Sequence, residues 1–529
     1  MNKINNTFLK LSKRAETNDI DYLVKTFVNN GPLFTILSNK DHEILYGRRG
    51  TGKTHALAYL SDSLNLKNEI IVTIDLRTIG SNGGIFSDNT IPIKERATRL
   101  LIDTFSFIID SIIDTVINNN TGKYNLAKVS PIADLLWDSV TQIVVDGGIE
   151  IAEKSTTNDS TSQQSKFGVD VGTDKFSASS STGKDKKSDA STEIYTKQEG
   201  KQYHRINFSS VYKHLQTLSQ ELNTHIWIIF DEWAEVPQDL QPFLAELIRR
   251  TILPNTGITV KIAAIEQRTN LLYIDGVGNR IGVEIGADIA ASQNLDEYMV
   301  FDNDEERAKV FFTELLYHHF VNIAETELLE ETGINEAQKL INLAFTQVNA
   351  FSEFVRASEG IARDAINILG IAAIKANDNK ISIENVRAAA RIWYTRGKEK
   401  SISTHEKALN LLQWIIDEVI GKRNARAFLL QTNQRDPLID YLFDARVLHI
   451  IKENVSGKDT PGLRYNVYSI DYGCYVELIN TANAPKGLFE ALADDEEEAG
   501  EIFVDVPKND YRAIRRAILD LSEFYKEVV

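Results

Sequence analysis

A glycine-rich turn near the N-terminus constrains the fold of this chain more than any other feature. The turn reads Gly47-Arg48-Arg49-Gly50-Thr51-Gly52-Lys53-Thr54, which fits the pattern G-x-x-x-x-G-K-[ST] at every fixed position. A short apolar run, 43–46, precedes it, and residues 55–64 after it have the character of a helix. Glycines at these places let backbone N–H groups converge on an anion at the N-terminus of that helix. The pattern therefore predicts a strand, a phosphate-binding loop and a helix, in that order.

Two side chains of the turn have specific expected roles in binding ATP together with Mg²⁺. Lys53 is expected to place its ammonium group against the β- and γ-phosphates, and the Thr54 hydroxyl is expected to ligate Mg²⁺. Residues 47–52 are expected to surround the phosphates with backbone N–H groups. His55 follows directly. It is interpreted mainly as a packing or surface residue and is retained as a candidate nucleotide contact.

A second apolar segment ends in two acids. Residues 226–230 read Ile-Trp-Ile-Ile-Phe, which is typical of a buried strand, and Asp231 and Glu232 follow. Two carboxylates at the end of such a strand are costly to desolvate unless a cation accompanies them. Asp231 is therefore predicted to bind Mg²⁺ through water, and Glu232 to polarise the attacking water as general base. The glycine turn upstream disfavours the alternative, an ordinary exposed turn with two acids.

Four further residues are candidates for contacts to the γ-phosphate. The apolar run 260–265 ends in Glu266-Gln267-Arg268, and either Gln267 or Arg268 is a candidate to read the γ-phosphate from the tip of a strand. The alternative for both is a polar turn without such a role. Arg250 and Arg280 rank together as candidates for an arginine finger, which stabilises charge on the transferring phosphoryl group.

Strands and helices alternate in the first half of the chain. This alternation predicts an α/β fold with a parallel sheet covered by helices on both faces. Residues 154–202 are poor in large apolar side chains, and they are predicted to form a mobile insertion or a loose hairpin. The expected organisation is a nucleotide-binding core, a helical lid, a winged-helix domain and an acidic tail with a C-terminal helix, at 1–303, 304–400, 401–480 and 481–529 respectively.

Hydrophobic periodicity also predicts the bounds of particular elements. Residues 298–301 are predicted as the last strand of the sheet, and 352–377 as a single helix of the lid. The second helix of the winged-helix domain is predicted at 437–450, and the return strand of its wing at 465–470.

Charge, cysteine content and hydropathy exclude several classes of protein. A net charge of −17 does not suit a protein that coats nucleic acid non-specifically, because such proteins need clustered Lys and Arg. The single cysteine, Cys474, allows no internal disulfide and no cysteine zinc cluster, so a reducing cytoplasm is the expected location. No apolar run approaches the length of a membrane span, and no membrane partner is expected.

The winged-helix region leaves two kinds of partner open. Asp436, Asp440 and Asp444 recur at i, i+4 and i+8, which places three carboxylates on one face of the helix that would enter a DNA groove. Residues 401–480 contain nine Lys and Arg against ten Asp and Glu. Basic residues before that helix and at the wing are still candidate contacts to a DNA backbone: Lys422, Arg423, Arg426, Lys452, Lys458 and Arg464. DNA binding and docking to a protein remain alternatives.

The segment Ser358-Glu359-Gly360-Ile361-Ala362-Arg363-Asp364-Ala365 resembles the sensor-2 helix of AAA+ proteins in the replication-initiator group, the origin-recognition and Cdc-type ATPases. The resemblance implies that Arg363 reaches the γ-phosphate from a helical lid. A winged helix after the lid is also the order of domains in that group. Residues 230–244, 260–268 and 286–288 look like bacterial ATPases grouped with the initiators, for which a place in genome defence is plausible.

Two functions from different classes follow. In the first, ATP holds the lid against the sheet through Lys53, Arg268 and Arg363, and the chain is a nucleotide-gated switch for a protein effector, as an anti-phage defence sensor would be. In the second, the chain is an ATP-dependent initiator or loader that assembles as a homo-oligomer on DNA. Both require the Lys53 ammonium and the Asp231 carboxylate to lie in one cleft.

Overall fold

The structure is a computed structural model of the 529-residue chain. It describes residues 2–29, 33–80, 88, 90–118, 123–146, 149–155, 178–180, 192–198, 201–302, 304–423, 425–432, 435–456, 462–479 and 518–528. Most of the predicted insertion at 154–202 and the acidic block at 494–498 lie outside these residues. None of the described helices combines the length and the apolar character that crossing a bilayer requires.

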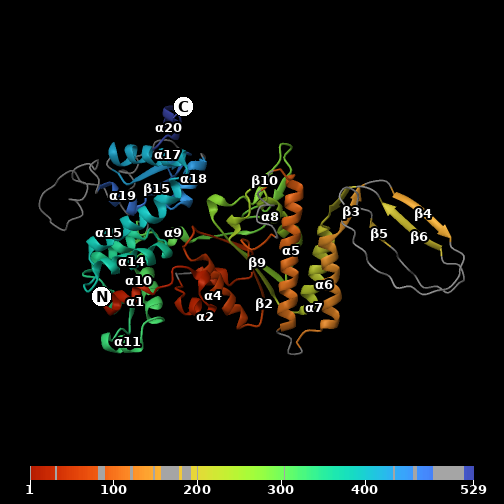
Figure 1. Cartoon of the computed structure of the whole chain (residues 1–529), viewed down its shortest axis with the longest axis horizontal. Coiled ribbons are helices and arrows are strands. Elements are labelled where there is room, and N and C mark those ends of the chain that lie inside the picture. Colours follow the sequence, from red (N-terminus) through yellow and green to blue (C-terminus); the bar gives the residue numbers. More distant parts are fainter. Residues whose placement is uncertain are drawn as a thin grey trace. The chain divides into compact units, whose positions relative to one another are not determined.

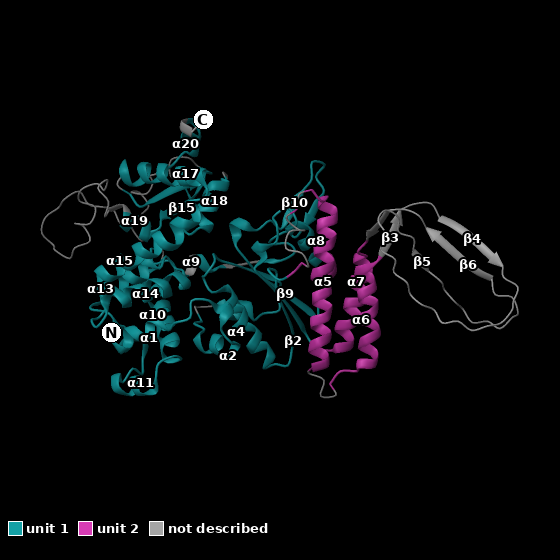
Figure 2. Ribbon diagram, viewed as in Figure 1, with its two compact units in different colours: residues 1–78, 224–249, 256–529 teal, residues 79–223, 250–255 magenta. Residues whose placement is uncertain are grey.

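The chain folds into two compact units, which Figure 2 shows in different colours. The first consists of residues 1–78, 224–249 and 256–529, and the second of residues 79–223 and 250–255. In the second unit α5 packs on α6, and α6 packs on α7. Its described elements are α5 (Ile93–Asn118), α6 (Leu126–Thr141), α7 (Phe208–Leu222), and the antiparallel strands β3 (Ile143–Asp146), β4 (Ile149–Ser155), β5 (Ala178–Ser180), β6 (Thr192–Gln198) and β7 (Lys201–His204).

The first unit contains a five-stranded parallel sheet in the order β12-β1-β9-β8-β2, of which Figure 1 labels β9 and β2. Every residue of β8 and β9 is buried, as expected for apolar strands that are covered on both faces. The strand β9 lies between β1, which leads into the glycine turn, and β8, which ends at Asp231. The predicted parallel α/β core is therefore confirmed. The strands are β1 (Glu43–Tyr46), β2 (Ile70–Asp75), β8 (Ile226–Asp231), β9 (Ile258–Ala264) and β12 (Ala290–Asn294).

The prediction of a last strand at 298–301 is wrong. The last strand is β12, whose sequence Ala-Ala-Ser-Gln-Asn has no run of large apolar residues because β12 lies at the edge of the sheet. A short helix, α9 (Leu295–Met299), follows at once, since the Asn294 side chain accepts a hydrogen bond from the backbone N–H of Asp296 and caps that helix. Other elements of this core are α1 (Lys3–Leu9), η1 (Ala15–Thr17), α2 (Ile20–Thr26), α3 (Leu33–Leu37), α4 (Lys53–Asn65), η2 (Trp233–Glu235), α8 (Gln241–Thr251), η3 (Glu266–Arg268), β10 (Leu272–Ile274) and β11 (Arg280–Gly282).

The lid is helical, as predicted, but the single helix expected at 352–377 is two helices. Glu359 and Gly360 have φ values of +50° and +75°, which end one helix before the next begins. A Cβ atom on Gly360 would lie 2.9 Å from the carbonyl carbon of Met299, so this turn also needs glycine for packing. The lid helices are α10 (Glu305–Val321), α11 (Thr326–Thr332), α12 (Ala337–Ala344), α13 (Val348–Ala357), α14 (Ala362–Ala376) and α15 (Ile383–Trp393).

The C-terminal part has the expected helices and wing, with an antiparallel sheet in the order β13-β15-β14. The predicted helix 437–450 ends earlier, at Asp444, because Arg446 adopts a left-handed φ of +61° and Leu448 begins a strand. The C-terminal helix α20 packs here, with Phe524 in the same core as Trp414. The elements are η4 (Tyr394–Lys398), α16 (Glu399–Ile402), α17 (Glu406–Ile416), η5 (Asp417–Gly421), β13 (Ala427–Gln431), α18 (Pro437–Asp444), β14 (Leu448–Ser456), β15 (Arg464–Ile470), α19 (Tyr472–Ile479) and α20 (Leu521–Val528).

Candidate functional site

The glycine turn connects β1 to α4 and lies against the first turn of α14. Gly50 and Gly52 have φ values of +90° and +101°, a conformation that residues with a Cβ rarely adopt. A Cβ on Gly50 would lie 2.7 Å from the Cβ of Arg363, so glycine is also needed for the close approach of the lid. The Arg363 backbone N–H donates to the carbonyl oxygen of Gly50 at 3.0 Å. The turn and the predicted sensor-2 arginine are therefore direct neighbours.

Lys53 is buried in the curve of this turn. Its ammonium group donates to the carbonyl oxygens of Gly47 at 2.8 Å and Arg48 at 3.1 Å. Burial lowers the pKa of Lys53, and the negative charges of Glu232 and Asp231 oppose that shift. The cation is thus held at the end of the sheet where the two acids lie.

The two acids at the end of β8 meet the turn through Thr54. The Thr54 hydroxyl donates to Oδ2 of Asp231 at 2.8 Å, and Oδ1 of Asp231 accepts the backbone N–H of Glu232 at 2.8 Å. Burial raises the pKa of Asp231, and burial together with the charge of Asp231 raises the pKa of Glu232. Glu232 also has a left-handed φ of +55°. Hydroxyl and carboxylate oxygens are the ligand atoms that Mg²⁺ prefers, so this pair fits that metal.

A cavity of about 320 Å³ brings these groups together. From the turn it is lined by Arg49, Gly50, Gly52, Lys53 and Thr54, and from the neighbouring elements by His55, Glu232 and Arg363. Lys53 and Glu232 therefore share one cleft, and Asp231, which does not line it, meets it through its bond to Thr54.

The sequence analysis missed the wall of the cavity formed by the N-terminal segment. Eight residues between Ser12 and Leu23 line it, and the rings of Tyr22, His55 and His319, which also line it, lie next to one another. Nδ1 of His319 is 2.8 Å from the Tyr22 hydroxyl, and Nε2 of His55 is 2.6 Å from the carbonyl oxygen of Leu23. Burial lowers the pKa of His319 to about 3 and also lowers that of His55, so both rings are neutral. The rings of Tyr22, His55 and His319 suit the uncharged end of a nucleotide, while Lys13, Arg14 and Glu16 are the charged residues of the same wall. Residues 12–23 contain no motif that marks this wall.

A second missed group is a carboxylate shared by two arginines at the cavity. Glu16 lies 3.6 Å from a guanidinium nitrogen of Arg77 and 3.7 Å from one of Arg363. Arg77 follows β2 and also pairs with Asp75 at 2.6 Å. Both arginines line the cavity, and a triphosphate would compete with Glu16 for them.

The other predicted residues are placed differently. Among the described residues that line the cavity, Gln267, Arg268 and Arg280 do not occur. Arg268 pairs with Asp444 of α18 at 3.3 Å, and Arg435 donates to the carbonyl oxygen of Gln267. Arg280 is exposed and pairs with Glu284 at 2.7 Å. In the second unit, the guanidinium of Arg250 lies over the ring of Phe208 at 5.6 Å.

The three carboxylates on α18 all have partners. Asp444 pairs with Arg268, and Asp440 accepts from Arg435 at 2.7 Å. Asp436 caps the helix and accepts from the hydroxyl of Tyr525 in α20 at 2.7 Å. The acidic face of α18 is therefore directed toward η3 of the core and toward α20.

Comparison with known proteins agrees with the resemblance seen in the sequence. A family model described as ORC-CDC6-like matches residues 11–76, which include the N-terminal cavity wall, the glycine turn and β2. No curated protein matches the chain. Cdc6p from Pyrobaculum aerophilum is 12% identical with a TM-score of 0.31, over 89% of this chain and 97% of that one. The Orc1 protein of Aeropyrum pernix, solved in complex with DNA, is 13% identical with a TM-score of 0.26, over 86% and 93%.

Proposed function

We propose that this chain is an ATPase that acts as a nucleotide-gated switch, in which the triphosphate site controls the docking of the winged-helix domain. One observation carries the proposal: Lys53, Glu232 and Arg363 line one cavity, next to the bonded pair of Thr54 and Asp231. Transfer of a phosphoryl group to water needs a cation at the phosphates, a metal site and a residue that orients the water. This cavity offers all three.

The metal would be held by Thr54 and, through water, by Asp231. Burial raises the pKa of Asp231, so the charged carboxylate gains from a nearby cation. Bound Mg²⁺ would neutralise charge on the β- and γ-phosphate oxygens. Lys53 would leave the carbonyl oxygens of the turn for the phosphates, since a charge-assisted bond to phosphate is stronger than one to a neutral oxygen.

Glu232 is the proposed general base. It lines the same cavity, and burial raises the pKa of its carboxyl, which makes it a better proton acceptor than an exposed glutamate. It lies one residue beyond Asp231, so it can act on a water next to the metal without binding the metal itself.

The lid would respond to the triphosphate through Arg363. Its backbone already bonds to Gly50, and its side chain shares Glu16 with Arg77. Transfer of the Arg363 guanidinium from Glu16 to the γ-phosphate would tie α14 to the nucleotide. Arg250 and Arg280 are proposed as candidates for an arginine finger given to the next copy in a homo-oligomer. Arg268 would reach a γ-phosphate only if its pair with Asp444 broke.

Contacts of the winged-helix domain favour a protein effector over a DNA backbone. The carboxylate of Glu418 already binds Lys422 and Arg423, and Arg426 pairs with Glu359. The face of α18 that would enter a DNA groove carries Asp444, which binds Arg268 of the core. A defence sensor, which the sequence resemblance implies, would use such a docked domain as its output.

The substitution Glu232→Gln tests the proposal. This variant is expected to bind ATP like the wild type and to lose about 10²- to 10⁴-fold in the rate of phosphate release, because the general base is gone. The matched control is Glu235→Gln, which removes another carboxylate that lines the cavity and pairs with Arg49. Wild-type turnover in the Glu232→Gln variant, measured at saturating ATP, would rule out this residue as the base.

The loader alternative is tested with the full chain. A loader would bind DNA in a salt-dependent way and would assemble further when ATP and DNA are both present. A switch for a protein effector would show ATP-dependent changes in the winged-helix domain without DNA. Sedimentation with and without ATP and DNA distinguishes the two.

A further inference from the structure

Arg48 stands at a variable position of the glycine turn, yet its side chain is buried and faces away from the cavity. Only 1% of it is exposed. Its backbone N–H and Nε donate to the two carboxylate oxygens of Asp296, both at 2.9 Å, and Nη2 donates to the carbonyl oxygen of Glu359 at 3.3 Å. The remaining guanidinium nitrogen, Nη1, donates to Nδ1 of His449 on β14. One side chain of the phosphate loop thus bonds to the core, the lid and the winged-helix domain.

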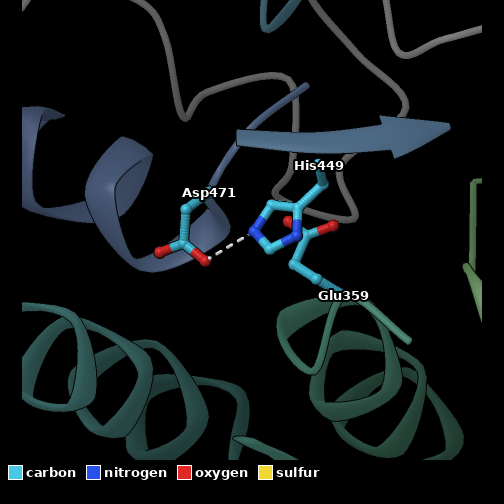
Figure 3. A group of neighbouring side chains, drawn as sticks. All are labelled: Glu359, His449 and Asp471. Atoms are coloured by element: carbon cyan, nitrogen blue, oxygen red, sulfur yellow. Dashed lines mark hydrogen bonds and ion pairs between the residues drawn. The ribbon is translucent and has the colours of Figure 1, made fainter. Parts of the chain in front are cut away.

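The chemistry of Arg48 fixes the tautomer of His449. A guanidinium is only a donor, so Nδ1 of His449 must accept, and the proton must lie on Nε2. Nε2 then donates to Oδ2 of Asp471 at 3.0 Å (Figure 3). Burial and the charge of Arg48 lower the pKa of His449 to about 3, which agrees with a neutral ring.

The bonds continue from Asp471 back to the lid. Lys398 bonds to Asp471 and, at 2.9 Å, to Asp364, which follows Arg363 in α14. Asp364 also pairs with Arg446 at the end of α18. A continuous set of bonds therefore runs from the phosphate loop through the winged-helix domain to the helix that carries Arg363.

A metal ion is a weaker explanation of this cluster. The side chains of Glu359, His449 and Asp471 each offer a ligand atom, and these atoms lie within 4.8 Å of one another (Figure 3). Both ring nitrogens of His449 are engaged, however, and Oε1 of Glu359 binds Arg426 and the backbone N–H of Tyr472. Because Arg48, Arg426 and Lys398 already bond to the cluster, its charges are balanced without a metal.

We infer that His449 is a positioning residue for the phosphate loop, and that binding of a nucleoside triphosphate and docking of the winged-helix domain stabilise each other through Arg48. This inference rests on the proposed function, because it assigns the coupling route of the same switch. When bound phosphates order the glycine turn, Arg48 is held in the position from which it bonds to His449. Thermodynamic linkage then requires docking to raise nucleotide affinity by the same factor, which for coupled sites is about 5- to 150-fold.

The single cysteine of the chain is a natural reporter of docking. Cys474 is buried at the start of α19, and the neighbouring Gly473 packs so closely that a Cβ there would lie 2.5 Å from the carbonyl oxygen of Ala390 in the lid. Cys474 lies in the core of the winged-helix domain, while Tyr472 and Val476 of the same helix lie in the core of the lid, so a thiol reagent can reach Cys474 only when α19 opens. The labelling rate of Cys474 in the full chain therefore measures opening of α19, which docking of the winged-helix domain on the lid opposes.

The test compares His449→Leu with His449→Gln in the full chain. Leucine removes both bonds, whereas the glutamine amide can accept from Arg48 with its oxygen and donate to Asp471 with its nitrogen. His449→Leu is expected to lose about 5- to 150-fold in ATP affinity and to label faster at Cys474, with no response to ATP. His449→Gln is expected to keep wild-type ATP affinity and wild-type labelling of Cys474. Adding Arg48→Met to His449→Leu is expected to cause little further loss of ATP affinity.

Wild-type protein provides a measurement that needs no interface variant. ATP is expected to slow the labelling of Cys474 at least about fivefold, and to have no effect in Lys53→Ala. If wild-type protein binds ATP but its labelling does not change, or if folded His449→Leu keeps wild-type affinity, the coupling is overturned while the ATPase proposal stands. If wild-type protein binds no ATP, the ATPase proposal itself fails.

Discussion

The phosphate loop has two different faces, a cavity face that includes Arg49 and an interface face that includes Arg48. The Arg49 side chain is 42% exposed, lines the cavity and pairs with Glu235. The Arg48 side chain is 1% exposed and is bonded into the lid and the winged-helix domain. The turn therefore directs the Arg49 side chain to the cavity and the Arg48 side chain to a buried interface.

The ion-paired groups Asp471 and Lys398 of the interface are shifted in the opposite sense from the acids and the lysine of the cavity. At the cavity, burial raises the pKa of Asp231 and Glu232 and lowers that of Lys53, so their charged forms are disfavoured. At the interface, the partners lower the pKa of Asp471 and raise that of Lys398, so their charged forms are favoured. The first pattern marks a site that gains from a charged ligand, and the second marks an interface that is already neutralised.

The largest effect is expected from breaking the interface at its centre with Lys398→Met. This substitution leaves the carboxylates of Asp364 and Asp471 buried without the cation they share. Loss of one partner of a buried ion pair costs about 3–5 kcal/mol, so the melting temperature should fall by many degrees. Thermal denaturation followed by circular dichroism measures this change.

The matched control is Lys422→Met, since the side chain of Lys422 is 67% exposed and its partner Glu418 keeps Arg423. The control is expected to lose at most about 1 kcal/mol. Equal melting temperatures for the two variants would mean that the buried network contributes no more than a surface pair.

Removing the lysine of the cavity face is expected to lower the affinity for ATP and not the stability of the fold. Lys53→Ala should weaken ATP binding at least about 100-fold, which corresponds to about 2.8 kcal/mol, because the cation for the β- and γ-phosphates is lost. The fold should remain intact, since Lys53 bonds only to carbonyl oxygens of its own turn. Titration with a fluorescent ATP analogue checks this, and unchanged affinity would remove the site assignment.

The cavity face could be predicted from the sequence because its signals are local. The glycine turn and the acids after 226–230 are short motifs, and each lies at the end of an apolar strand. Arg363 was identified through a family resemblance. The interface face gives no such signal, because Arg48 and His449 are 401 positions apart and Arg48 fills a variable position of the motif. Only the folded chain brings these two residues together.

The predicted bounds of two helices are wrong because a residue with a left-handed φ ends each helix while the hydrophobic periodicity continues. Apolar residues continue on both sides of Glu359 and Gly360, so hydrophobic periodicity alone does not separate α13 from α14, although Gly360 is a helix-ending residue type. The same is true of Arg446, where the apolar residues of α18 continue into β14. Both breaks lie in the interface network, since Glu359 pairs with Arg426 and Arg446 pairs with Asp364.

Acid should weaken the interface through His449. Its pKa is about 3 in the folded chain and about 6.5 when unfolded, so the unfolded chain binds one more proton between these pH values. Stability therefore rises with pH across that window and falls on acidification, by about 2 kcal/mol from pH 7 to pH 5 for this group.

Comparison of wild type with His449→Gln isolates that contribution. The ring faces Arg48, Asp471, Lys398 and Glu359. Burial raises the pKa of Glu359 to about 7, and this acts with the opposite sign, but it is common to both proteins and cancels in the difference. From pH 7 to pH 5, the free energy of unfolding measured by urea denaturation should fall by about 2 kcal/mol less in the variant than in wild type. A constant difference at both pH values would contradict a buried neutral His449.

The smallest effect is expected at the second contact between core and winged-helix domain, the pair of Arg268 and Asp444. These side chains are 33% and 25% exposed and lie 3.3 Å apart, so solvent screens the pair and Arg268→Ala should weaken docking by at most about 1 kcal/mol. ATP turnover should fall less than about fivefold, as in the control Lys10→Ala, whose exposed pair with Glu325 lies elsewhere in the same unit. A loss of about 10³-fold or more in turnover would instead mean that Arg268 leaves Asp444 and reaches the γ-phosphate during the reaction, the role that its place after the end of β9 suggests. In that case the exposed contact, and not the buried network, would be the part of the interface that moves in each catalytic cycle.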